Sequence, residues 1–580
     1  MPRMKALKRF VFVAFAIIAV RLFFIQIIEH DVWVSRASEQ HTLLETISAR
    51  RGEIYMMDGT DPVPVVLNQT TYSVIIDPAV TDRERLESTL ATNAKGHITA
   101  DLGQVFATEG LRYSIVARGI SHTAAQKIAD QEIPGVWFQK GAERVYPEGE
   151  LGSTVLGFVN ADGLGQYGIE GAMNHLLKGK DGLLKSISDV NNVALSIGDD
   201  NVKIPAVDGQ NVVLSIDRGL ERGIEEIATT AIEDTPATNA AVLVMNPNSG
   251  EVLAMSSLPG YDPGNYGNVK DAGSYLNQVT EVPYEPASIF KNFAFSAALN
   301  EGKMTPDTTY MNEPFVEIDN VKIWNAEQRD KLNHHTLTMR DALYWSLNAG
   351  SIKALELLGD NPDEITATGR ERLYDYYHNK FRLGQATGIE LIEAEGFIWD
   401  PHAEIYGLNA AYANMTFGQN LSATMIQTAT AFSAVVNGGY YRTPTVVKGT
   451  LADDTITPLD NSEKISEQIL STETSSAMRE MLIHNRDYKV KNGIDRAGYD
   501  VGGKSGTAQT IVAGAYDDSM SQLIGSYIGF VARSGEMPSY VIMVKMWGEG
   551  QALSGGEAQV LFDSLSNYVI DYLKLKPNGV

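Results

Sequence analysis

The residues most suited to catalysis by type and spacing are a serine and a lysine three positions apart, Ser288 and Lys291. If a helix begins just after Pro286, residues three apart lie on one face, so the lysine amine can reach the serine hydroxyl. A serine hydroxyl becomes a good nucleophile only when a nearby base takes its proton, and a lysine amine is such a base only when its pKa is lowered. Burial and a second nearby cation would both lower that pKa. The pair therefore indicates acyl-serine chemistry, although Ser-x-x-Lys alone is a weak signal.

Two further motifs follow in chain order. Ser346 and Asn348 form a Ser-x-Asn motif, and residues 504–507 read Lys-Ser-Gly-Thr. The set Ser-x-x-Lys, Ser-Asp-Asn and Lys-Thr-Gly is known from penicillin-binding proteins and serine β-lactamases. The present motifs match it with Leu347 in place of aspartate and Ser505 in place of threonine, and neither change removes a group that the chemistry needs. The alternative is three unrelated helix and loop segments, and the joint match favours one acyl-serine active site.

Length and composition restrict the function classes. A chain of 580 residues suggests about three domains. The formal net charge of −25 argues against nucleic-acid binding, which needs clustered Lys and Arg; an acidic, solvated surface is the simpler interpretation. Because the chain has no cysteine, a disulfide, a thiolate metal site and a cysteine nucleophile are excluded. No phosphate-binding loop or dinucleotide fingerprint is found, so no cofactor is expected.

The first 28 residues are typical of a signal anchor. Residues 10–28 form an apolar stretch of about 19 residues, interrupted by Arg21, which suits one membrane-spanning helix. Basic residues within 1–9 favour a cytoplasmic N-terminus, so everything after Ile28 would be exported. No Ala-x-Ala cleavage site follows, which favours an uncleaved anchor over a signal peptide; a buried soluble helix is the other alternative. Arg21 would either snorkel to the interface or contact a partner helix.

The residues between the anchor and about 235 show no catalytic constellation. Alternating apolar runs at 72–76 and 212–216 predict strands, and 81–90 and 124–130 predict polar-faced helices. Tight turns are expected at Asp58-Gly59, Gly149 and Gly168.

An amphipathic helix should close this region. Asp217 is a suitable N-cap for a helix that runs to about Glu233. Residues 234–238 then read as a linker.

The rest of the chain predicts strands at its two ends and helices between them. Hairpins are expected from 241–245 with 251–255 and from 524–531 with 540–546. Helices are expected at 288–299, 339–358, 423–437 and 558–573. Strands early and late in a domain, with helices between, indicate an α+β fold in which helices pack on an antiparallel sheet.

With these motifs in place, the chain resembles a class B, monofunctional penicillin-binding protein over nearly its full length. The runs that support the resemblance are 51–54, 144–171, 261–263, 388–391 and 416–424. The resemblance implies a cytoplasmic tail at 1–9, a transmembrane anchor at 10–28, a non-catalytic pedestal of the dimerisation type at 29–235 and a transpeptidase domain at 236–580. Helices are then expected on both faces of the transpeptidase sheet. Ala287 departs from the glycine often found in the family, and Ile289 from a small polar residue.

The resemblance also implies a role for each motif residue. Ser288 would be the nucleophile and Lys291 the general base, with Ser346 relaying a proton and Asn348 orienting Lys291 and the substrate amide. Lys504 would attract the carboxylate of a D-Ala-D-Ala stem peptide and lower the pKa of Lys291. The substrate-binding residues would be Lys504, Ser505, Gly506, Thr507 and Asn348. The backbone N–H groups of Ser288 and Thr507 would form the oxyanion hole.

The expected function is peptidoglycan D,D-transpeptidation, with β-lactams acylating the same serine. Residues 284–286 and 505–509 look most like division-type members, which would work in the cell membrane with a glycosyltransferase and other division proteins. A carboxypeptidase or β-lactamase-like hydrolase is the second hypothesis, which the long pedestal disfavours. It would need an acid such as Glu390, Glu393 or Glu395 to activate water. A membrane β-lactam sensor or divisome scaffold is the third; the intact motifs disfavour a scaffold, and the short cytoplasmic segment disfavours a sensor.

Other polar clusters have simpler interpretations. His334 and His335 are adjacent, so they cannot both face one metal ion from a regular element, and a solvated loop is expected. Asp453-Asp454 and Asp517-Asp518 are expected in polar loops. No metal site is predicted.

Overall fold

The computed structural model of the protein describes residues 2–33, 42–187, 202–325, 327–460, 462, 464–487, 495–509, 511–512, 515–516 and 522–577. Contacts divide the chain into two compact units. The first unit comprises Met1–Gly52, Thr70–Ala142 and Lys178–Gly209, and the second comprises Glu53–Gln69, Glu143–Leu177 and Gln210–Val580. Because the chain passes between the units several times, the domain boundary at residue 235 stays a prediction.

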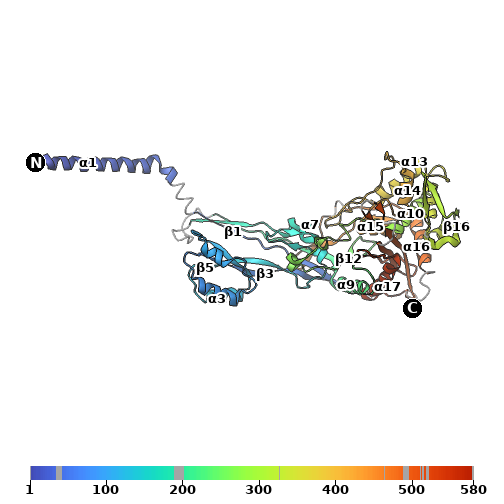
Figure 1. Ribbon diagram of the computed structural model, residues 1–580, viewed down its shortest axis with the longest axis horizontal. Coiled ribbons are helices and arrows are strands. Elements are labelled where there is room, and N and C mark those ends of the chain that lie inside the picture. The colour runs from blue at the N-terminus through green and yellow to red at the C-terminus, as the bar shows by residue number, and fades with distance from the viewer. Residues whose placement is uncertain are drawn as a thin grey trace. The chain divides into compact units, whose positions relative to one another are not determined.

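The N-terminal segment is one long apolar helix (Figure 1). Helix α1 spans Pro2–Phe23 and continues as the π-helix η1 over Phe24–Ile28. The stretch Met4–Ile28 is long and apolar enough to cross a membrane, and its large apolar side chains are exposed. Apolar side chains all round a helix are typical of a membrane span. The helix is consistent with the anchor predicted at 10–28.

The first unit contains a three-stranded antiparallel sheet and a small α/β cluster. The sheet consists of β1 (Thr42–Ile47), β8 (Gly182–Ile187) and β9 (Val202–Ile204). In the cluster, β4 (Ser114–Ile120) pairs with the last residues of β3 (Asp61–Ile76), which confirms the strand predicted at 72–76.

Two capped helices pack on this cluster and confirm the helices predicted at 81–90 and 124–130. In α3 (Arg83–Asn93) the N-cap is Asp82, and in α5 (His122–Ala129) it is Ser121; each side chain accepts a backbone N–H of the first turn. Their buried apolar faces meet the strands at Val74, Ile76, Leu86, Leu90, Ile120 and Ile128.

A mixed sheet begins the second unit. β10 (Asn211–Asp217) pairs in parallel with β2 (Ile54–Asp58) and antiparallel with β18 (Val447–Ala452), whose far edge takes β19 (Thr455–Thr457). β2 also pairs with the start of β3 through the predicted turn, where Gly59 has a φ of +64°.

The central sheet of the second unit has five antiparallel strands in the order β12-β11-β25-β24-β21. These strands are β11 (Asn239–Met245), β12 (Val252–Leu258), β21 (Tyr499–Gln509), β24 (Leu523–Arg533) and β25 (Tyr540–Trp547). Both predicted hairpins are confirmed, because β11 pairs with β12 and β24 pairs with β25. β21 stands at one end of this order.

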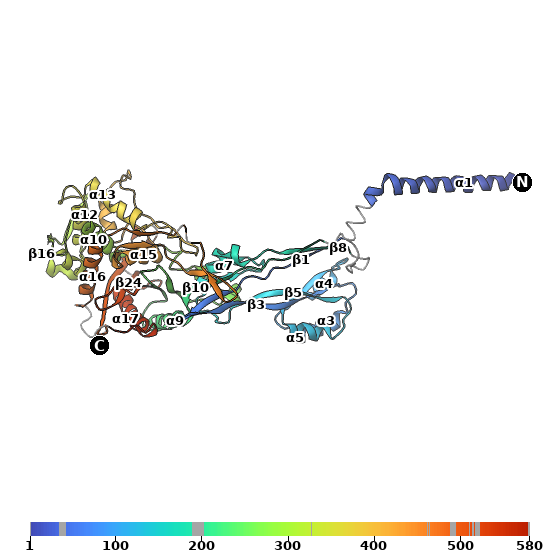
Figure 2. The same ribbon diagram turned by 180° about the vertical axis from the view of Figure 1, so that it is seen from behind.

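Helices cover both faces of this sheet, as predicted for the α+β fold. On one face, α9 (Arg218–Glu233) and α17 (Gly555–Tyr572) lie side by side (Figure 2). Their apolar residues join alternate strand residues in one core that includes Leu220, Ile224, Val242, Val244, Leu561 and Leu565. The intervening strand residues face the opposite way, as the two-residue repeat of a strand requires, and join a larger core that includes Leu243, Phe290, Phe293, Phe432, Ile528 and Met543.

Helix ends follow their capping residues. Asp217 accepts the N–H groups of Gly219 and Leu220 and so starts α9 as predicted. Thr424 and Ser554 begin α15 (Met425–Val436) and α17 with reciprocal capping boxes. The continuous helix predicted at 339–358 is wrong, because the structure divides it into α11 (Met339–Trp345) and α12 (Asn348–Leu358).

The remaining elements are the helix α4 of the first unit, the ten-residue strand β5, which pairs with β3, and the other helices, turns and short strands of the second unit. They are α4 (Leu102–Ala107), β5 (Val136–Val145), α6 (Ser153–Leu156), β6 (Phe158–Val159), β7 (Gly165–Gln166), α7 (Gly168–Ala172), α8 (Asn174–Leu177), η2 (Pro263–Asn268), η3 (Ala272–Tyr275), η4 (Ala287–Phe290), α10 (Lys291–Asn300), β13 (Thr309–Asn312), β14 (Phe315–Ile318), β15 (Val321–Trp324), η5 (Glu327–Leu332), β16 (His335–Thr338), α13 (Ala367–Tyr374), η6 (Asp375–Lys380), α14 (Leu408–Met415), β17 (Tyr440–Arg442), β20 (Ser466–Gln468), α16 (Thr472–Asp487), β22 (Ile511–Val512) and β23 (Ala515–Tyr516).

A buried carboxyl group and a partly buried one lie one turn apart on α9. Glu221 is fully buried, and its Oε2 accepts the Met255 N–H at 2.8 Å. Glu225 accepts the Gly152 N–H at 3.0 Å and the Ser256 hydroxyl at 3.2 Å. Burial raises the pKa of both carboxyl groups, and repulsion from Glu225 raises that of Glu221 further.

Replacing Glu225 with glutamine is expected to weaken the pH dependence of stability. A carboxyl group whose pKa is higher in the folded chain stabilises the fold at low pH, and this contribution is lost as the pH rises through the folded pKa. The free energy of unfolding should therefore fall for the wild type between pH 5 and 8, by roughly 1–3 kcal/mol more than for Glu225→Gln. Denaturant unfolding at both pH values measures this, with the exposed Glu226→Gln as control. Equal pH slopes in all three proteins would contradict it.

Candidate active site

The Ser-x-x-Lys motif lies on a tight turn that leads into a buried helix. The regular helix predicted at 288–299 is wrong at its start: η4 is a 3₁₀ turn, and α10 begins only at Lys291. Side chains three residues apart eclipse one another in a 3₁₀ turn, so the predicted contact is made more directly than in an α-helix. The Lys291 amine lies 3.0 Å from the Ser288 hydroxyl.

The Lys291 amine also meets the Ser-x-Asn motif. It donates to the Ser346 carbonyl at 2.8 Å and to Asn348 Oδ1 at 2.8 Å, and it lies 3.3 Å from the Ser346 hydroxyl. The side chain is fully buried, with the Phe417 ring centre 5.7 Å from the amine. The structure therefore brings together four of the predicted residues, Ser288, Lys291, Ser346 and Asn348, around one amine. We call these four residues the Ser288 cluster.

The break between α11 and α12 is what delivers Ser346 to the cluster. Ser346 ends α11 with a φ of +58°, in the left-handed region that non-glycine residues adopt at a cost. This turn exposes the Ser346 carbonyl and hydroxyl to Lys291, and Asn348 begins α12 immediately after it. The Nδ2 group of Asn348 donates to the Trp324 carbonyl at 2.8 Å, which fixes the orientation of the side chain. Because the Nδ2 group has two hydrogens, one is left for a substrate.

The third motif lies on β21, beside η4. Lys504 pairs with Ile528 and Thr507 with Gly525 of β24. The Lys504 side chain is fully buried, and its ammonium group donates to the Ser505 carbonyl at 2.9 Å. The Thr507 side chain is exposed, and its hydroxyl oxygen accepts the Gly555 N–H at 2.9 Å, so the hydroxyl hydrogen can still donate.

Gly506 allows β21 to approach the nucleophile turn. A Cβ atom at this position would lie 2.5 Å from the Pro286 carbonyl oxygen and 2.7 Å from the Ser526 hydroxyl. The first contact is with backbone, so η4 or the strand would have to move.

Replacing Gly506 with alanine is expected to lower the rate of Ser288 acylation by roughly 10- to 100-fold, since displacement of reacting groups by a fraction of an ångström has effects of this size. Stopped-flow acylation by a fluorescent penicillin measures the rate. Gly267→Ala is the matched control, because a Cβ at Gly267 would meet nothing within 4 Å. A wild-type rate for Gly506→Ala would contradict the close approach.

Ala287, at a position where the family often has glycine, has a strained backbone. Its φ is +51°, a left-handed conformation that costs an L-residue about 1–2 kcal/mol. Its N–H donates to the Gly418 carbonyl at 3.1 Å. A Cβ at Gly418 would lie 2.1 Å from the Ala287 carbonyl oxygen, so Gly418 must be glycine for this contact to form.

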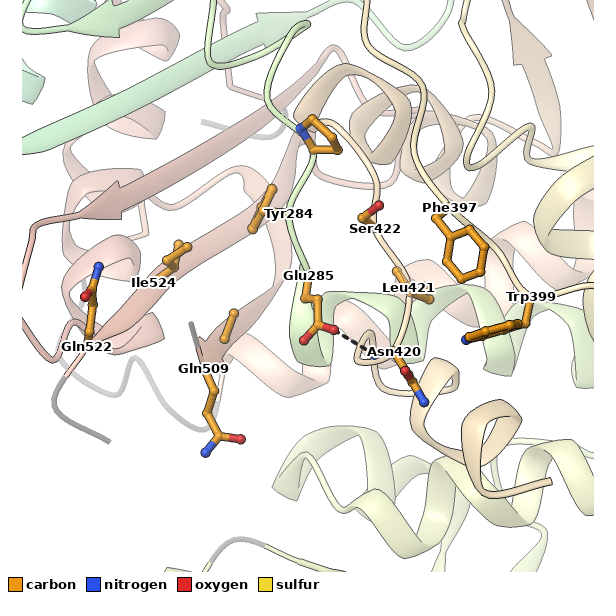
Figure 3. Close-up of a pocket in the computed structure, with 12 residues that line it drawn as sticks. Tyr284, Glu285, Phe397, Trp399, Asn420, Leu421, Ser422, Gln509, Gln522 and Ile524 are labelled. Atoms are coloured by element: carbon orange, nitrogen blue, oxygen red, sulfur yellow. Dashed lines mark hydrogen bonds between the residues drawn. The ribbon is translucent and has the colours of Figure 1, made fainter. Parts of the chain in front are cut away.

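A cavity of about 590 Å³ adjoins the cluster without containing it (Figure 3). It reaches Glu285, three residues before the nucleophile, and Ala508 and Gln509, which follow Thr507. Its full lining is Pro283, Tyr284, Glu285, Phe397, Trp399, Asn420, Leu421, Ser422, Ala508, Gln509, Gln522 and Ile524. Figure 3 shows Glu285 directed toward Asn420, whose N–H it accepts at 2.9 Å.

Sequence reasoning missed the contacts made by Trp324, Phe417, Gly418 and Gly555. Gly418 stands in the run 416–424 that supported the resemblance, so a signal for it was present. Trp324 and Gly555 contribute backbone groups, which any residue type carries, and no sequence signal could have identified them.

The acids considered for water activation have other partners or face solvent. Glu390 forms an ion pair with Lys464 at 2.5 Å, and Glu393 accepts the Thr387 hydroxyl at 2.7 Å. Glu395 is exposed.

His334, His335 and the pair Asp453-Asp454 lie in exposed turns or at the start of a strand. His334 has a φ of +62° and pairs with Glu313 at 2.7 Å, whereas His335 opens strand β16, so the loop prediction is wrong for His335. Asp453-Asp454 form the turn between β18 and β19. Asp517-Asp518 lie outside the described residues.

Comparison with known proteins places this geometry in context. Residues 240–566 match the family described as "Penicillin binding protein transpeptidase domain", and residues 46–214 match "Penicillin-binding Protein dimerisation domain". Stage V sporulation protein D of Bacillus subtilis is 28% identical over 548 residues, which cover 92% of this chain and 79% of that protein. Peptidoglycan D,D-transpeptidase FtsI of Buchnera aphidicola is 24% identical over 580 residues, covering 98% and 95%.

Solved structures share the fold. A peptidoglycan synthetase from Bifidobacterium adolescentis aligns with a TM-score of 0.71 at 22% identity, over 93% of this chain and 98% of that one. Penicillin Binding Protein 2X from Streptococcus thermophilus also aligns with a TM-score of 0.71 at 22% identity, over 92% and 80%. The resemblance predicted from the motifs is confirmed.

Proposed function

Because the chain belongs to the penicillin-binding protein transpeptidase family, we propose that it is a peptidoglycan D,D-transpeptidase of class B that cross-links stem peptides through an acyl group on Ser288. β-Lactams acylate the same serine. The observation that carries the proposal is the buried Lys291 amine, 3.0 Å from the Ser288 hydroxyl and 2.8 Å from Asn348 Oδ1. An amine held in this way can take the hydroxyl proton as attack begins.

Acylation starts with the donor peptide beside β21. A D-Ala-D-Ala stem adds to the sheet edge by main-chain hydrogen bonds, and Lys504 attracts its terminal carboxylate. Ser288 Oγ attacks the carbonyl of the penultimate D-alanine while its proton passes to neutral Lys291. The carbonyl oxygen becomes an oxyanion between the N–H groups of Ser288 and Thr507, and removal of one such donor typically costs ~3 kcal/mol.

Collapse of the intermediate breaks the amide bond and leaves the acyl group on Ser288. The proton held by Lys291 passes through the Ser346 hydroxyl to the departing nitrogen, so D-alanine leaves as an amine. The amine of a second stem peptide then attacks the acyl-serine, forms the new amide bond and loses its proton to the same relay. The Ser288 hydroxyl is regenerated, and the two peptides are cross-linked.

The remaining parts of the proposal concern location. The N-terminal helix anchors the chain in the cell membrane in a single pass, with residues 1–9 in the cytoplasm and the catalytic domain outside. We propose two further domains: the pedestal at residues 29–235 and the transpeptidase domain at residues 236–580. The resemblance of residues 284–286 and 505–509 to division-type members supports a septal role beside a glycosyltransferase. Fluorescence microscopy of the protein fused to a fluorescent protein tests this role, and the fusion should gather at the septum of dividing cells.

Transfer to an amine distinguishes this proposal from hydrolysis. The full chain in detergent is incubated with a D-Ala-D-Ala pentapeptide and an amine-bearing acceptor peptide, and the products are identified by mass spectrometry. The cross-linked peptide should form with the wild type and not with Ser288→Ala. Formation of only the shortened tetrapeptide, at every acceptor concentration, would replace the transpeptidase with a carboxypeptidase.

A further inference from the structure

A buried lysine on the central sheet lies outside the Ser288 cluster. Lys545, on β25, is 2% exposed. Its amine donates to Gln278 Oε1 at 3.1 Å and lies 4.9 Å from the ring centre of Tyr284 and 4.5 Å from that of Trp547. None of these contacting groups, all in the described part of the chain, is a carboxylate, and burial lowers the pKa of Lys545 to about 7.

Burial of the Lys545 amine lowers the stability of the folded protein. Desolvation penalises its charged form, and the unbranched apolar side chain of methionine would fill similar space without that penalty. A local feature that disfavours folding is expected where function requires it.

The contacts of Lys545 point to the segment that enters the active site. Gln278 and Tyr284 stand at the two ends of the chain segment 278–284, which runs to Pro286 and the nucleophile turn. Tyr284 is tied on its other side to Ala423 by two backbone hydrogen bonds of 3.0 and 3.1 Å. Figure 3 shows Tyr284 against the strands of the sheet, and Glu285, the next residue, turned toward Asn420. Lys545 therefore holds this segment from the side of the sheet.

The same segment sets the approach of the nucleophile to β21. The Pro286 carbonyl oxygen faces Gly506, where a Cβ would come within 2.5 Å. Ser526, which also crowds Gly506, is the cross-strand partner of Lys545 on β24. A shift of Tyr284 would thus move Pro286 against the strand that carries the third motif.

We propose that Lys545 is a positioning residue for acylation: by holding Gln278 and the Tyr284 ring from the sheet, it fixes the segment that places Ser288 against β21. The inference rests on the proposed acylation of Ser288 and adds a residue that none of the three motifs contains.

The hold depends on the charge of the amine. The groups that face it are Gln278, the rings of Tyr284 and Trp547, Ala241 on β11 and Ser526 on β24. Of these only Tyr284 titrates, and burial raises its pKa. Attraction to the rings exists for the protonated amine alone, so the hold is expected to be strongest below about pH 7 and to weaken above it.

The test compares the full-length wild type with Lys545→Met by stopped-flow acylation with a fluorescent penicillin, which separates the dissociation constant of the first complex from the acylation rate constant. Lys448→Met, which removes a partly exposed lysine paired with Glu251, is the matched control. At pH 6.5 the acylation rate constant of Lys545→Met should fall about tenfold with the dissociation constant nearly unchanged. The difference from wild type should shrink above pH 8, and the melting temperature should not fall.

Several outcomes would overturn the inference. Equal acylation by wild type and Lys545→Met at all pH values would refute it and leave the proposed function intact, whereas no acylation of the wild type would refute both. A variant that only changes the melting temperature would show a purely structural role. If Lys545→Met does not fold, Gln278→Leu removes the amine's acceptor and must show the same fall in the acylation rate constant.

Discussion

Replacing Lys291 with methionine is expected to lower the rate of Ser288 acylation by about a thousandfold or more. The variant loses the group that takes the serine proton, so the hydroxyl remains a poor nucleophile. Methionine is close to lysine in length and packs well against an aromatic ring such as Phe417, so the fold should be kept. Stopped-flow acylation by a fluorescent penicillin measures the rate, and thermal unfolding checks the fold.

A second lysine provides the control. Lys353 on α12 pairs with Glu356 at 3.1 Å, so Lys353→Met removes a charge without touching the Ser288 cluster. It should be acylated at the wild-type rate. If Lys291→Met were acylated within about tenfold of wild type, Lys291 would not be the base.

Replacing Asp563 with alanine is expected to have the largest effect on stability, a loss of about 3–5 kcal/mol in the free energy of unfolding. Its partner Arg486 has a fully buried side chain and binds Asp563 and Asp495, each at 2.6 Å. Without Asp563, part of the buried guanidinium charge loses its compensation. The neighbouring Asn485 donates to the Gly503 carbonyl at 2.5 Å, so α16 also supports β21. Denaturant unfolding measures the loss.

A surface ion pair on α17, the helix that also carries Asp563, is the matched control. Asp571 on α17 pairs with Arg496, and the two side chains are 63% and 41% exposed. Solvent screens such a pair, so Asp571→Ala should cost less than about 1 kcal/mol. Equal losses for Asp563→Ala and Asp571→Ala would contradict the role assigned to burial.

Motif spacing predicted which side chains meet but not how the backbone brings them together. The spacing of Ser288 and Lys291 is enough to place one beside the other, because it follows from helix geometry. The contact of Ser346 with Lys291 depends on a helix break that the sequence did not reveal, since apolar residues continue through 339–358. The left-handed turn at Ser346 is held by tertiary contacts, the Lys291 amine bonding both its carbonyl and its hydroxyl.

The sheet was predicted more completely than the surroundings of the active site. Two hairpins could be recognised because turn residues separate pairs of apolar runs. The order of the strands, with β21 next to β24 and at the end of the sheet, comes from contacts between segments far apart in the chain. The orientation of Asn348 was beyond prediction for a similar reason, since it depends on a backbone carbonyl at Trp324.

Intact-protein mass spectrometry with benzylpenicillin tests the central claim most directly. Wild type and Ser288→Ala are incubated with the drug and followed for hours. The account predicts a stable adduct, with the mass of one drug molecule, on the wild type alone. An adduct of equal amount on Ser288→Ala, or none on either protein, would contradict an acyl-serine site at Ser288. An adduct that forms and disappears while the drug is consumed would instead establish a β-lactam hydrolase on this fold.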